Sequence, residues 1–309
     1  MKLTFVSQGK LLISGEYLVL EGASALALPT RLGQSMDVEL LPGSGNIHWM
    51  AKDFKGQLWL NCSFILQDDH FISVAMGTLA DSPEVKSLVK LLENALNLNP
   101  KYINNQTDYE ITCQLQFPRD WGLGSSSTLI ANIAKWAQVN PMELFFKSWE
   151  GSGYDVALAM ESKPIRYELK NQIPTWNIVP FNKPFCDKIY FIHLGNKQNS
   201  RNAITEYKSR PKAKPFQIEA VTSITNQLIA TNDFSEFEQL IEQHETVLSE
   251  ILGVEPIKKR LFSDYKGSVK SLGAWGGDFI LATGANAELY FNSKGYQTII
   301  PFHKMILDQ

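Results

Sequence analysis

Pro118-Arg-Asp-Trp-Gly-Leu-Gly-Ser-Ser-Ser-Thr128 is the stretch of this chain that decides its fold. Two glycines are followed at once by four hydroxyl residues, and residues 129–137 then have the composition of a helix. Glycines permit a tight backbone and close ligand approach, and the N–H groups and positive dipole end of a helix start attract phosphate. Hydroxyls there can bind phosphate oxygens or a magnesium ion. The stretch therefore predicts an anion site, although an ordinary serine-capped helix after a glycine turn explains the same residues.

The order of these residues excludes two common phosphate-binding motifs. No Gly-Lys-Ser/Thr ends the stretch as in a Walker A loop, and the glycines lack the spacing of a dinucleotide fingerprint. The stretch instead resembles the phosphate loop of the GHMP kinases, the family of galactokinase, homoserine kinase, mevalonate kinase and phosphomevalonate kinase. The matching residues are Pro118, Gly122, Leu123, Gly124, Ser125 and Ser126, with Ser127 in the position of a small residue.

This resemblance implies that ATP is the phosphoryl donor and that Mg²⁺ accompanies it. The backbone N–H groups of residues 122–126 are expected to hold the β- and γ-phosphates. Ser126 is the hydroxyl expected to face magnesium, and Ser125 and Ser127 are near alternatives.

A second segment of the resemblance lies at residues 9–22, Gly-Lys-Leu-Leu-Ile-Ser-Gly-Glu-Tyr-Leu-Val-Leu-Glu-Gly. Residues 3–6 and 11–13 are short β-prone runs, and the Gly-Lys pair between them predicts a turn. Taken alone, Lys10 is an ordinary solvated side chain. In the GHMP kinases the matching Gly-Lys and Gly-Glu-His/Tyr pairs face the active site. The resemblance therefore implies that Lys10 carries charge toward the phosphoryl acceptor and that Glu16 and Tyr17 border the substrate.

A third segment, Glu150-Gly-Ser-Gly-Tyr-Asp-Val-Ala-Leu-Ala159, places an aspartate before an Ala-rich helical run. Asp155 could simply cap that helix. The segment is nearly the form in which phosphomevalonate kinases hold their active-site aspartate. The resemblance implies that Asp155 orients the acceptor oxygen and takes its proton. Lys10, if it lies nearby, would lower the pKa of that carboxyl group.

The last segment is Ser271-Leu-Gly-Ala-Trp-Gly-Gly-Asp-Phe-Ile-Leu-Ala-Thr283. In the family the corresponding glycine loop packs beside the phosphates, and Gly276 and Gly277 are expected to border the substrate here. Trp275 stands where the family has glycine. Its large side chain either lines an altered pocket or folds outward. Ser200 follows a predicted strand and either borders the acceptor pocket or caps a helix.

The carboxylate that binds magnesium stays open between two residues. Mevalonate kinases supply a glutamate a helix-length before the aspartate, and Leu144 stands at that offset in this chain. Glu143, directly before it, is the favoured ligand, and Glu150 is the alternative.

Composition bounds the class of protein. The chain of 309 residues is 44% hydrophobic and 20% charged, values typical of a globular protein with a sizeable core. A formal net charge of -3 leaves no basic stripe for nucleic acid. Three widely spaced cysteines without a CxxC pair favour a reducing cytoplasm. We expect a small-molecule substrate, no signal peptide and no membrane span, while a homodimer is left open.

Periodicity predicts an α+β protein. Strands dominate the first hundred residues, and Ser82-Pro83 and Asn140-Pro141 begin helices. The polar, proline-punctuated stretch 161–188 suggests a transition between domains 1–170 and 171–309. For the second domain the pattern predicts a strand at 188–193, helices at 199–208, 216–231 and 234–252, and strands at 279–283, 287–291 and 297–300. The resemblance implies a ribosomal-protein-S5-like N-terminal domain and a ferredoxin-like C-terminal domain.

The four segments together predict a GHMP kinase that phosphorylates mevalonate or phosphomevalonate in isoprenoid precursor synthesis. Within this fold the alternatives are a diphosphomevalonate decarboxylase-like enzyme and a sugar or homoserine kinase. A catalytically silent nucleotide-binding protein is the alternative from another class, and Trp275 is its support in the sequence. The acceptor, the purine preference and the oligomeric state are not determined by the sequence.

Overall fold

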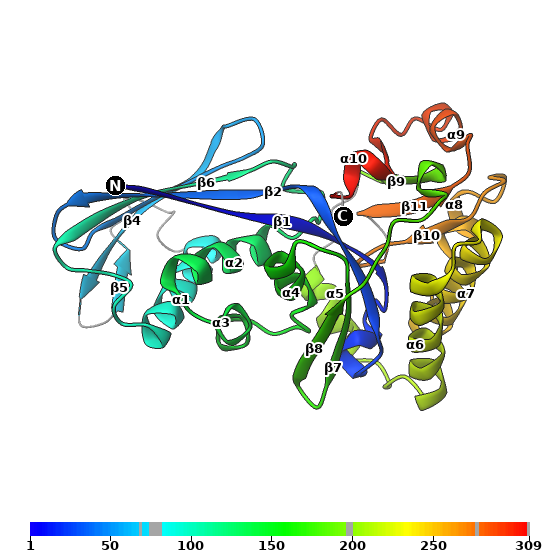
Figure 1. The fold of residues 1–309 in the computed structure, drawn as a ribbon, viewed down its shortest axis with the longest axis horizontal. Helices are drawn as coiled ribbons and strands as arrows, with labels where there is room; N and C mark the ends of the chain where they lie inside the picture. The colour runs from blue at the N-terminus through cyan, green and yellow to red at the C-terminus, as the bar shows by residue number, and fades with distance from the viewer. Residues whose placement is uncertain (68–69, 74–81, 196–199, 276–277, 308–309) are drawn as a thin grey trace. The chain divides into compact units, whose positions relative to one another are not determined.

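The computed structural model describes residues 1–67, 70–73, 82–195, 200–275 and 278–307. It is an α+β fold in which the chain forms two compact units (Figure 1). Unit 1 comprises Met1–Gly9, Leu32–Arg119 and Gly124–Met160, and unit 2 comprises Lys10–Arg31, Asp120–Leu123 and Glu161–Gln309. The predicted domain boundary at residue 170 stays a prediction about folding domains.

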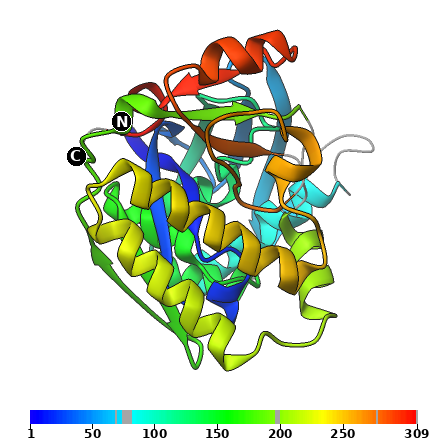
Figure 2. The ribbon, with the colours of Figure 1, turned by 90° about the vertical axis from the view of Figure 1, so that its right-hand side faces the viewer.

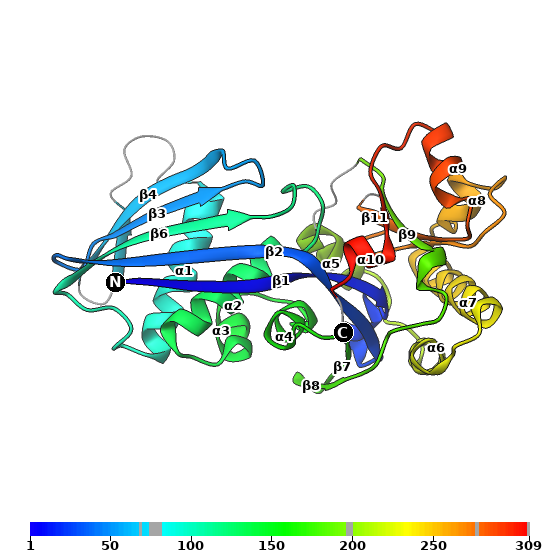
Figure 3. The ribbon, with the colours of Figure 1, turned by 45° about the horizontal axis from the view of Figure 1, so that its top comes forward.

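Unit 1 is a twisted sheet covered by helices. Its strands run in the order β5 (His70–Ser73), β4 (Leu58–Gln67), β3 (Ile47–Lys52), β6 (Thr107–Leu115) and β2 (Ala25–Pro42), and β1 (Lys2–Ser14) also pairs with β2. Helices α1 (Pro83–Leu98), α2 (Ser125–Ala137) and α3 (Pro141–Ser148) lie on one face (Figure 3). Every second residue of β3 is buried, as expected for strands that pack one face against helices.

Two helix starts in unit 1 follow from their capping residues, as predicted. The Ser82 hydroxyl accepts a hydrogen bond from the N–H of Val85 at 3.2 Å, and Pro83 occupies the first turn. The Asn140 side chain accepts from the N–H groups of Met142 and Glu143 at 2.9 and 3.2 Å. These caps determine where α1 and α3 begin. Helix α4 (Tyr154–Glu161) follows α3 and completes the helices of this unit up to Met160.

Unit 2 is built on an antiparallel sheet in the order β10 (Val269–Ser271), β11 (Phe279–Thr283), β9 (Ile189–His193) and β12 (Ile299–Pro301). Helices α6 (Pro215–Ala230) and α7 (Phe234–Leu252) lie side by side, and α7 contacts β10 (Figure 2). The shorter elements are η1 (Leu18–Glu21), η2 (Cys186–Lys188), α5 (Ser200–Lys208), α8 (Ile257–Leu261), α9 (Ala287–Ser293) and α10 (Phe302–Met305). Within the described ranges, none of the helices is long and apolar enough to span a bilayer.

Two expectations about secondary structure were wrong. The turn at Gly9-Lys10 does not form, because β1 continues through both residues to Ser14. Residues 287–291 form helix α9, whose Ala287 and Phe291 are both buried one helical turn apart. The proline-punctuated stretch contains a hairpin of β7 (Ile165–Lys170) and β8 (Ile173–Ile178), with Pro174 in an edge strand that tolerates it. The predicted ranges of α7 and β11 are confirmed.

Candidate functional site

The glycine loop delivers the chain to an uncapped helix start. Gly124 precedes α2 with φ of 90° in the left-handed region, and no side chain caps the helix. The first turn of α2 contains no acidic residue. Its backbone N–H groups and dipole therefore favour an anion at this end of the helix.

The hydroxyls at this helix start are not equivalent. The Ser127 hydroxyl is buried and donates to the carbonyl of Gly124 at 2.9 Å. Thr128 is buried as well and donates to Oε1 of Gln34 at 2.7 Å. Ser126 is exposed and Ser125 is half-buried. Of the three serines considered for magnesium, Ser127 is thus the one committed to the protein interior.

In unit 2, the first half of the loop lies against two of the other segments. The backbone N–H of Lys10 donates to the carbonyl of Leu123 at 2.9 Å. Gly122 has φ of 65°, and a Cβ added there would lie 2.6 Å from Oδ2 of Asp278. A side chain at this position would therefore be strained twice, by its backbone conformation and by the Asp278 carboxylate.

Aromatic side chains hold the residues just before Gly122. The Trp121 ring packs edge-on against Phe279 with centroids 5.4 Å apart, and Phe279 also contacts His193 at 5.1 Å. Nε2 of His193 donates to the carbonyl of Asp120 at 3.3 Å. His193 thus fixes the loop to the ends of β9 and β11.

Asp155 lies in the first turn of α4 rather than ahead of it. Its Oδ1 accepts from the N–H of Val156 at 3.0 Å, and its side chain is half-buried. The preceding Gly153 has φ of 79°, and a Cβ there would lie 2.7 Å from Cε of Met142. The left-handed backbone conformation therefore favours glycine in this turn, which sets where the aspartate emerges. The position at a helix N-terminus stabilises the ionised carboxylate.

The candidate magnesium carboxylates both lie near α3. Glu143 is exposed in its first turn, and Glu150 is exposed beyond its end. The described residues contain no group of three or more metal-binding side chains. Magnesium is usually held by one or two carboxylates together with substrate phosphates, so this arrangement is compatible with a metal that arrives with a nucleotide.

Glu16 is enclosed in the interior of unit 2. Its Oε1 pairs with Nζ of Lys270, and its Oε2 lies 3.4 Å from Nε2 of His244. All three side chains are at most 1% exposed. Burial raises the pKa of Glu16 to about 7, although the charge of Lys270 opposes this shift. The carboxylate that was expected to border the substrate is therefore engaged by the protein itself.

Tyr17 follows Glu16 in a sparsely populated backbone conformation with φ of 59°. Its ring stacks on Tyr207 with centroids 5.0 Å apart. Burial and the neighbouring Glu16 raise the pKa of the Tyr17 hydroxyl to about 12, so it stays protonated at neutral pH. Tyr17 can therefore act as a hydrogen-bond donor.

A cavity of about 220 Å³ lies beside Tyr17 within unit 2. Trp275 lines it and packs in the apolar cluster that contains Leu18 and Tyr207. Of the two alternatives for Trp275, the structure therefore supports a residue that lines a pocket. The other lining residues are Asn202, Ala203, Glu206, Tyr207, Arg210, Leu252 and Val254.

Three residues that were predicted to border the substrate lie wholly or partly outside the described part of the chain. Ser200 begins α5, but its side chain is outside the described part of the chain. Gly276 and Gly277 lie outside the described residues altogether.

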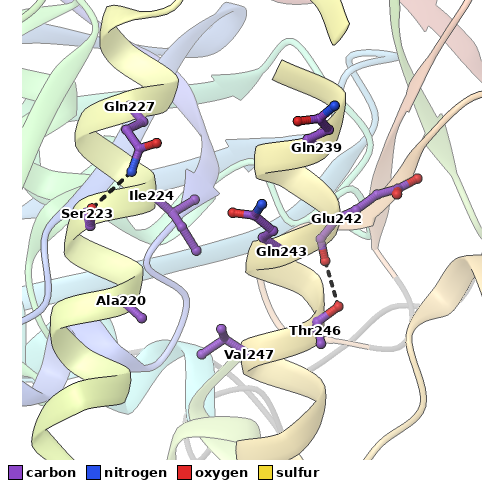
Figure 4. Close-up of a pocket in the computed structure, with 9 residues that line it drawn as sticks. All are labelled: Ala220, Ser223, Ile224, Gln227, Gln239, Glu242, Gln243, Thr246 and Val247. Atoms are coloured by element: carbon purple, nitrogen blue, oxygen red, sulfur yellow. Dashed lines mark hydrogen bonds between the residues drawn. The ribbon is translucent and has the colours of Figure 1, made fainter. Parts of the chain in front are cut away.

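A larger groove of about 690 Å³ lies between α6 and α7 (Figure 4). It is lined mainly by polar side chains, and none of the predicted site residues contributes to it. The lining residues are Ala220, Ser223, Ile224, Gln227, Gln239, Glu242, Gln243, Thr246 and Val247.

Sequence reasoning missed Lys270, Glu245 and Asp278 as members of these sites. Lys270 lies in a three-residue strand and is fully buried, although lysine in a short strand ordinarily faces solvent. Asp278 directly follows the glycines of the last segment, and this position was the available sequence signal that it belongs to the site. Nothing in the sequence around Glu245 distinguishes it from the exposed acids of α7.

Solved structures share this fold. L. major mevalonate kinase in complex with R-mevalonate has a TM-score of 0.67 at 14% identity, over 96% of this chain and 94% of that chain. Streptococcus pneumoniae phosphomevalonate kinase in complex with phosphomevalonate and AMPPNP has a TM-score of 0.65 at 15% identity, over 95% of each chain. Lactococcus lactis galactokinase complexed with galactose has a TM-score of 0.64 at 13% identity, over 97% and 94%.

No family model and no curated protein matches the chain. The solved structures nevertheless span nearly its whole length. The chain therefore has the fold of the GHMP kinases, as the sequence predicted, and at this level of identity the likeness concerns the fold.

Proposed function

We propose that this protein is an ATP- and magnesium-dependent small-molecule kinase of the GHMP family. The observation that carries the proposal is the uncapped start of α2 behind the left-handed Gly124. An exposed helix N-terminus with a glycine loop and exposed hydroxyls is suited to bind the phosphates of a nucleotide. The fold supports it, because a protein with the same fold was solved with AMPPNP.

The backbone of residues 122–126 is our candidate for the β- and γ-phosphates, with the Ser125 hydroxyl beside it, while the buried Ser127 hydroxyl supports the loop through Gly124. Ser126 and Glu143 are our candidates for magnesium, and Asp278 adds a carboxylate next to Gly122 that the motif comparison had not assigned. Bound magnesium would neutralise charge on the phosphates during transfer.

For an alcohol acceptor, Asp155 would accept the hydroxyl proton while the acceptor oxygen bonds to the γ-phosphorus. The bond between that phosphorus and the bridging oxygen then breaks, and ADP leaves. A phosphate acceptor is already ionised and needs Asp155 for orientation only. Lys10 would supply positive charge to the acceptor.

Mevalonate and phosphomevalonate are the acceptors we favour, on the resemblance of the segment around Asp155. Tyr17, Ser200, Gly276 and Gly277 are proposed to border the acceptor. Sugars and homoserine remain alternatives, as does a diphosphomevalonate decarboxylase-like reaction or nucleotide binding without turnover. A cytoplasmic location is part of the same proposal, and a homodimer stays open.

The test is an enzyme-coupled ADP-release assay with ATP and Mg²⁺ across an acceptor panel. The panel contains mevalonate, phosphomevalonate, diphosphomevalonate, homoserine, galactose and other sugars. We expect turnover with mevalonate or phosphomevalonate. Release of CO₂ from diphosphomevalonate would favour the decarboxylase, and ATP binding without turnover on any acceptor would favour the silent protein.

A further inference from the structure

The interior of unit 2 contains a cluster of charged side chains that none of the proposed chemical steps uses. Nζ of Lys270 pairs with Oε1 of Glu16 and also donates to the carbonyl of Ser271 at 2.8 Å. Glu16 and Lys270 are 254 positions apart in the chain, so the pair joins the end of β1 to β10. This contact links the Gly15-Glu16-Tyr17 turn directly to the strand that leads into Trp275.

Residues of helix α7 bind both the Gly15-Glu16-Tyr17 turn and the end of β10. Nε2 of His244 accepts the backbone N–H of Gly15 at 2.9 Å. Because Nε2 accepts, the ring is neutral, and burial holds the pKa of His244 well below its usual range. Its 3.4 Å approach to Glu16 is therefore a contact with a neutral ring and not an ion pair.

Glu245, the next residue of α7, holds the end of β10. Its carboxylate accepts from the N–H of Ser271 at 3.0 Å and from the Ser271 hydroxyl at 2.8 Å. It also accepts from the N–H of Ile257 at 3.2 Å. The residue from which the loop 272–275 departs is thus held at both its backbone and its side chain.

Two residues on the 220 Å³ cavity depend on this arrangement. Tyr17 follows Glu16 directly, and Trp275 lies four residues beyond Ser271. Both rings line this cavity and pack against the same group of apolar residues. The cluster therefore determines where both aromatic rings stand on the cavity wall.

The cluster is an unfavourable way to stabilise an interior. Oε2 of Glu16 and Nδ1 of His244 are buried and find no hydrogen-bond partner among the residues that the structure describes. Burial also makes the ionised form of Glu16 less favourable in the folded chain than in the unfolded chain, since its pKa is raised. Buried ion pairs are often no more stabilising than apolar replacements, and a positional role is one reason for their retention.

We propose that Lys270, with His244 and Glu245, is a positioning residue that fixes the Gly15-Glu16-Tyr17 turn to the start of loop 272–275. It thereby sets the cavity between Tyr17 and Trp275 at the expense of global stability. The positioning does not depend on the kinase activity. Its effect on turnover rests on the proposed function.

Hydrogen exchange of the full chain tests the positioning without any substrate. At pH 8, where Glu16 is ionised, Glu16→Gln should make amides of residues 15–18 and 271–275 exchange about tenfold faster, because a charge-assisted hydrogen bond becomes a neutral one. Lys270→Met should act on the same amides. Exchange in α6 should not change. Replacing both partners by apolar groups, as in Glu16→Leu/Lys270→Met, should leave global stability equal to or above that of the wild type, an outcome that a purely structural role does not produce.

The pH dependence supplies an internal check. The groups facing Glu16 are Lys270 from β10 and His244 and Glu245 from α7. Below about pH 7 the wild-type Glu16 is protonated, so the difference from Glu16→Gln should vanish after correction for intrinsic exchange. Lys294→Met is the matched control, because it breaks an exposed pair with Asp264 and should leave loop exchange unchanged.

Unchanged exchange at residues 15–18 and 271–275 in both variants would overturn the proposal. So would a uniform increase across unit 2 that parallels a loss of global stability. If the wild type releases ADP on an acceptor, both variants should raise KM for that acceptor more than they lower kcat. If the wild type releases no ADP on any acceptor, the proposed function is wrong. The hydrogen-exchange result still tests whether Lys270 positions the turn and the loop.

Discussion

The glycine loop and the Glu16–Lys270 cluster are both polar, yet they use polarity in opposite ways. At the start of α2 the backbone N–H groups are left uncapped and Ser126 faces outward. In the cluster Glu16 pairs with Lys270 inside the protein, and His244 and Glu245 bind Gly15 and Ser271. Backbone N–H groups left open at a surface invite a ligand, whereas charged side chains enclosed in the interior determine geometry.

The largest expected effect separates Asp155, the proposed catalytic residue, from the Glu16–Lys270 cluster. Asp155→Asn should lower turnover by about 10²- to 10⁴-fold, because the amide cannot accept the acceptor proton. The asparagine retains an oxygen for the N–H of Val156, so the start of α4 should persist. ADP release on the accepted substrate measures the effect, and Glu16→Gln should lose far less. Equal losses in the two variants would contradict the distinction between the two regions.

The second effect tests whether the glycine loop tolerates a side chain. Gly122→Ala should weaken ATP binding by about 10- to 100-fold, since it combines an unfavourable φ with a clash against Asp278. Gly253→Ala is the matched control, with φ of 60° and open space around its added methyl. It should cost about 1 kcal/mol of stability and leave ATP affinity unchanged. Titration calorimetry with ATP and Mg²⁺, together with urea unfolding, distinguishes the two.

A smaller effect should distinguish the outward serine from the inward one. Ser126→Ala should raise the Mg²⁺ concentration needed for half-maximal turnover by about tenfold, on the order of one lost charge-assisted contact. Ser127→Ala removes a hydroxyl that bonds to Gly124 and should chiefly lower the free energy of unfolding by about 1 kcal/mol. A magnesium dependence that shifts only with Ser127→Ala would reverse the assignment.

The smallest effect concerns pH. The pKa of Glu16 is about 7 in the folded chain, above the ordinary value of 4.5. Between these values the folded state binds more protons than the unfolded state, so this group makes stability fall as pH rises from about 4.5 to about 7. Above that window its contribution is constant. Urea unfolding across pH should show a flatter profile for Glu16→Gln, and an unchanged profile would indicate that Glu16 ionises normally.

Local signals carried much of the fold. The caps at Ser82 and Asn140 and the apolar period of α7 depend on residues a few positions apart, and all three elements form where predicted. The predicted turn at Gly9-Lys10 was wrong because the pairing of β1 with β2 overrides a weak local turn signal. The strand predicted at 287–291 was wrong because so short an apolar run fits the period of a strand and that of a helix equally well. Burial of both Ala287 and Phe291 favoured the helix.

The sequence by itself determined the class of fold, the glycine loop and the helix that follows it, because these depend on residue types at fixed short spacing. Only the tertiary structure decided that Glu16 faces Lys270, that Trp275 lines a cavity and that Asp278 lies against Gly122. Each of these contacts joins residues more than 150 positions apart or depends on the side-chain packing around them. The physical reason is that burial and partner, rather than residue type, decide whether a charged group serves a ligand or the protein interior.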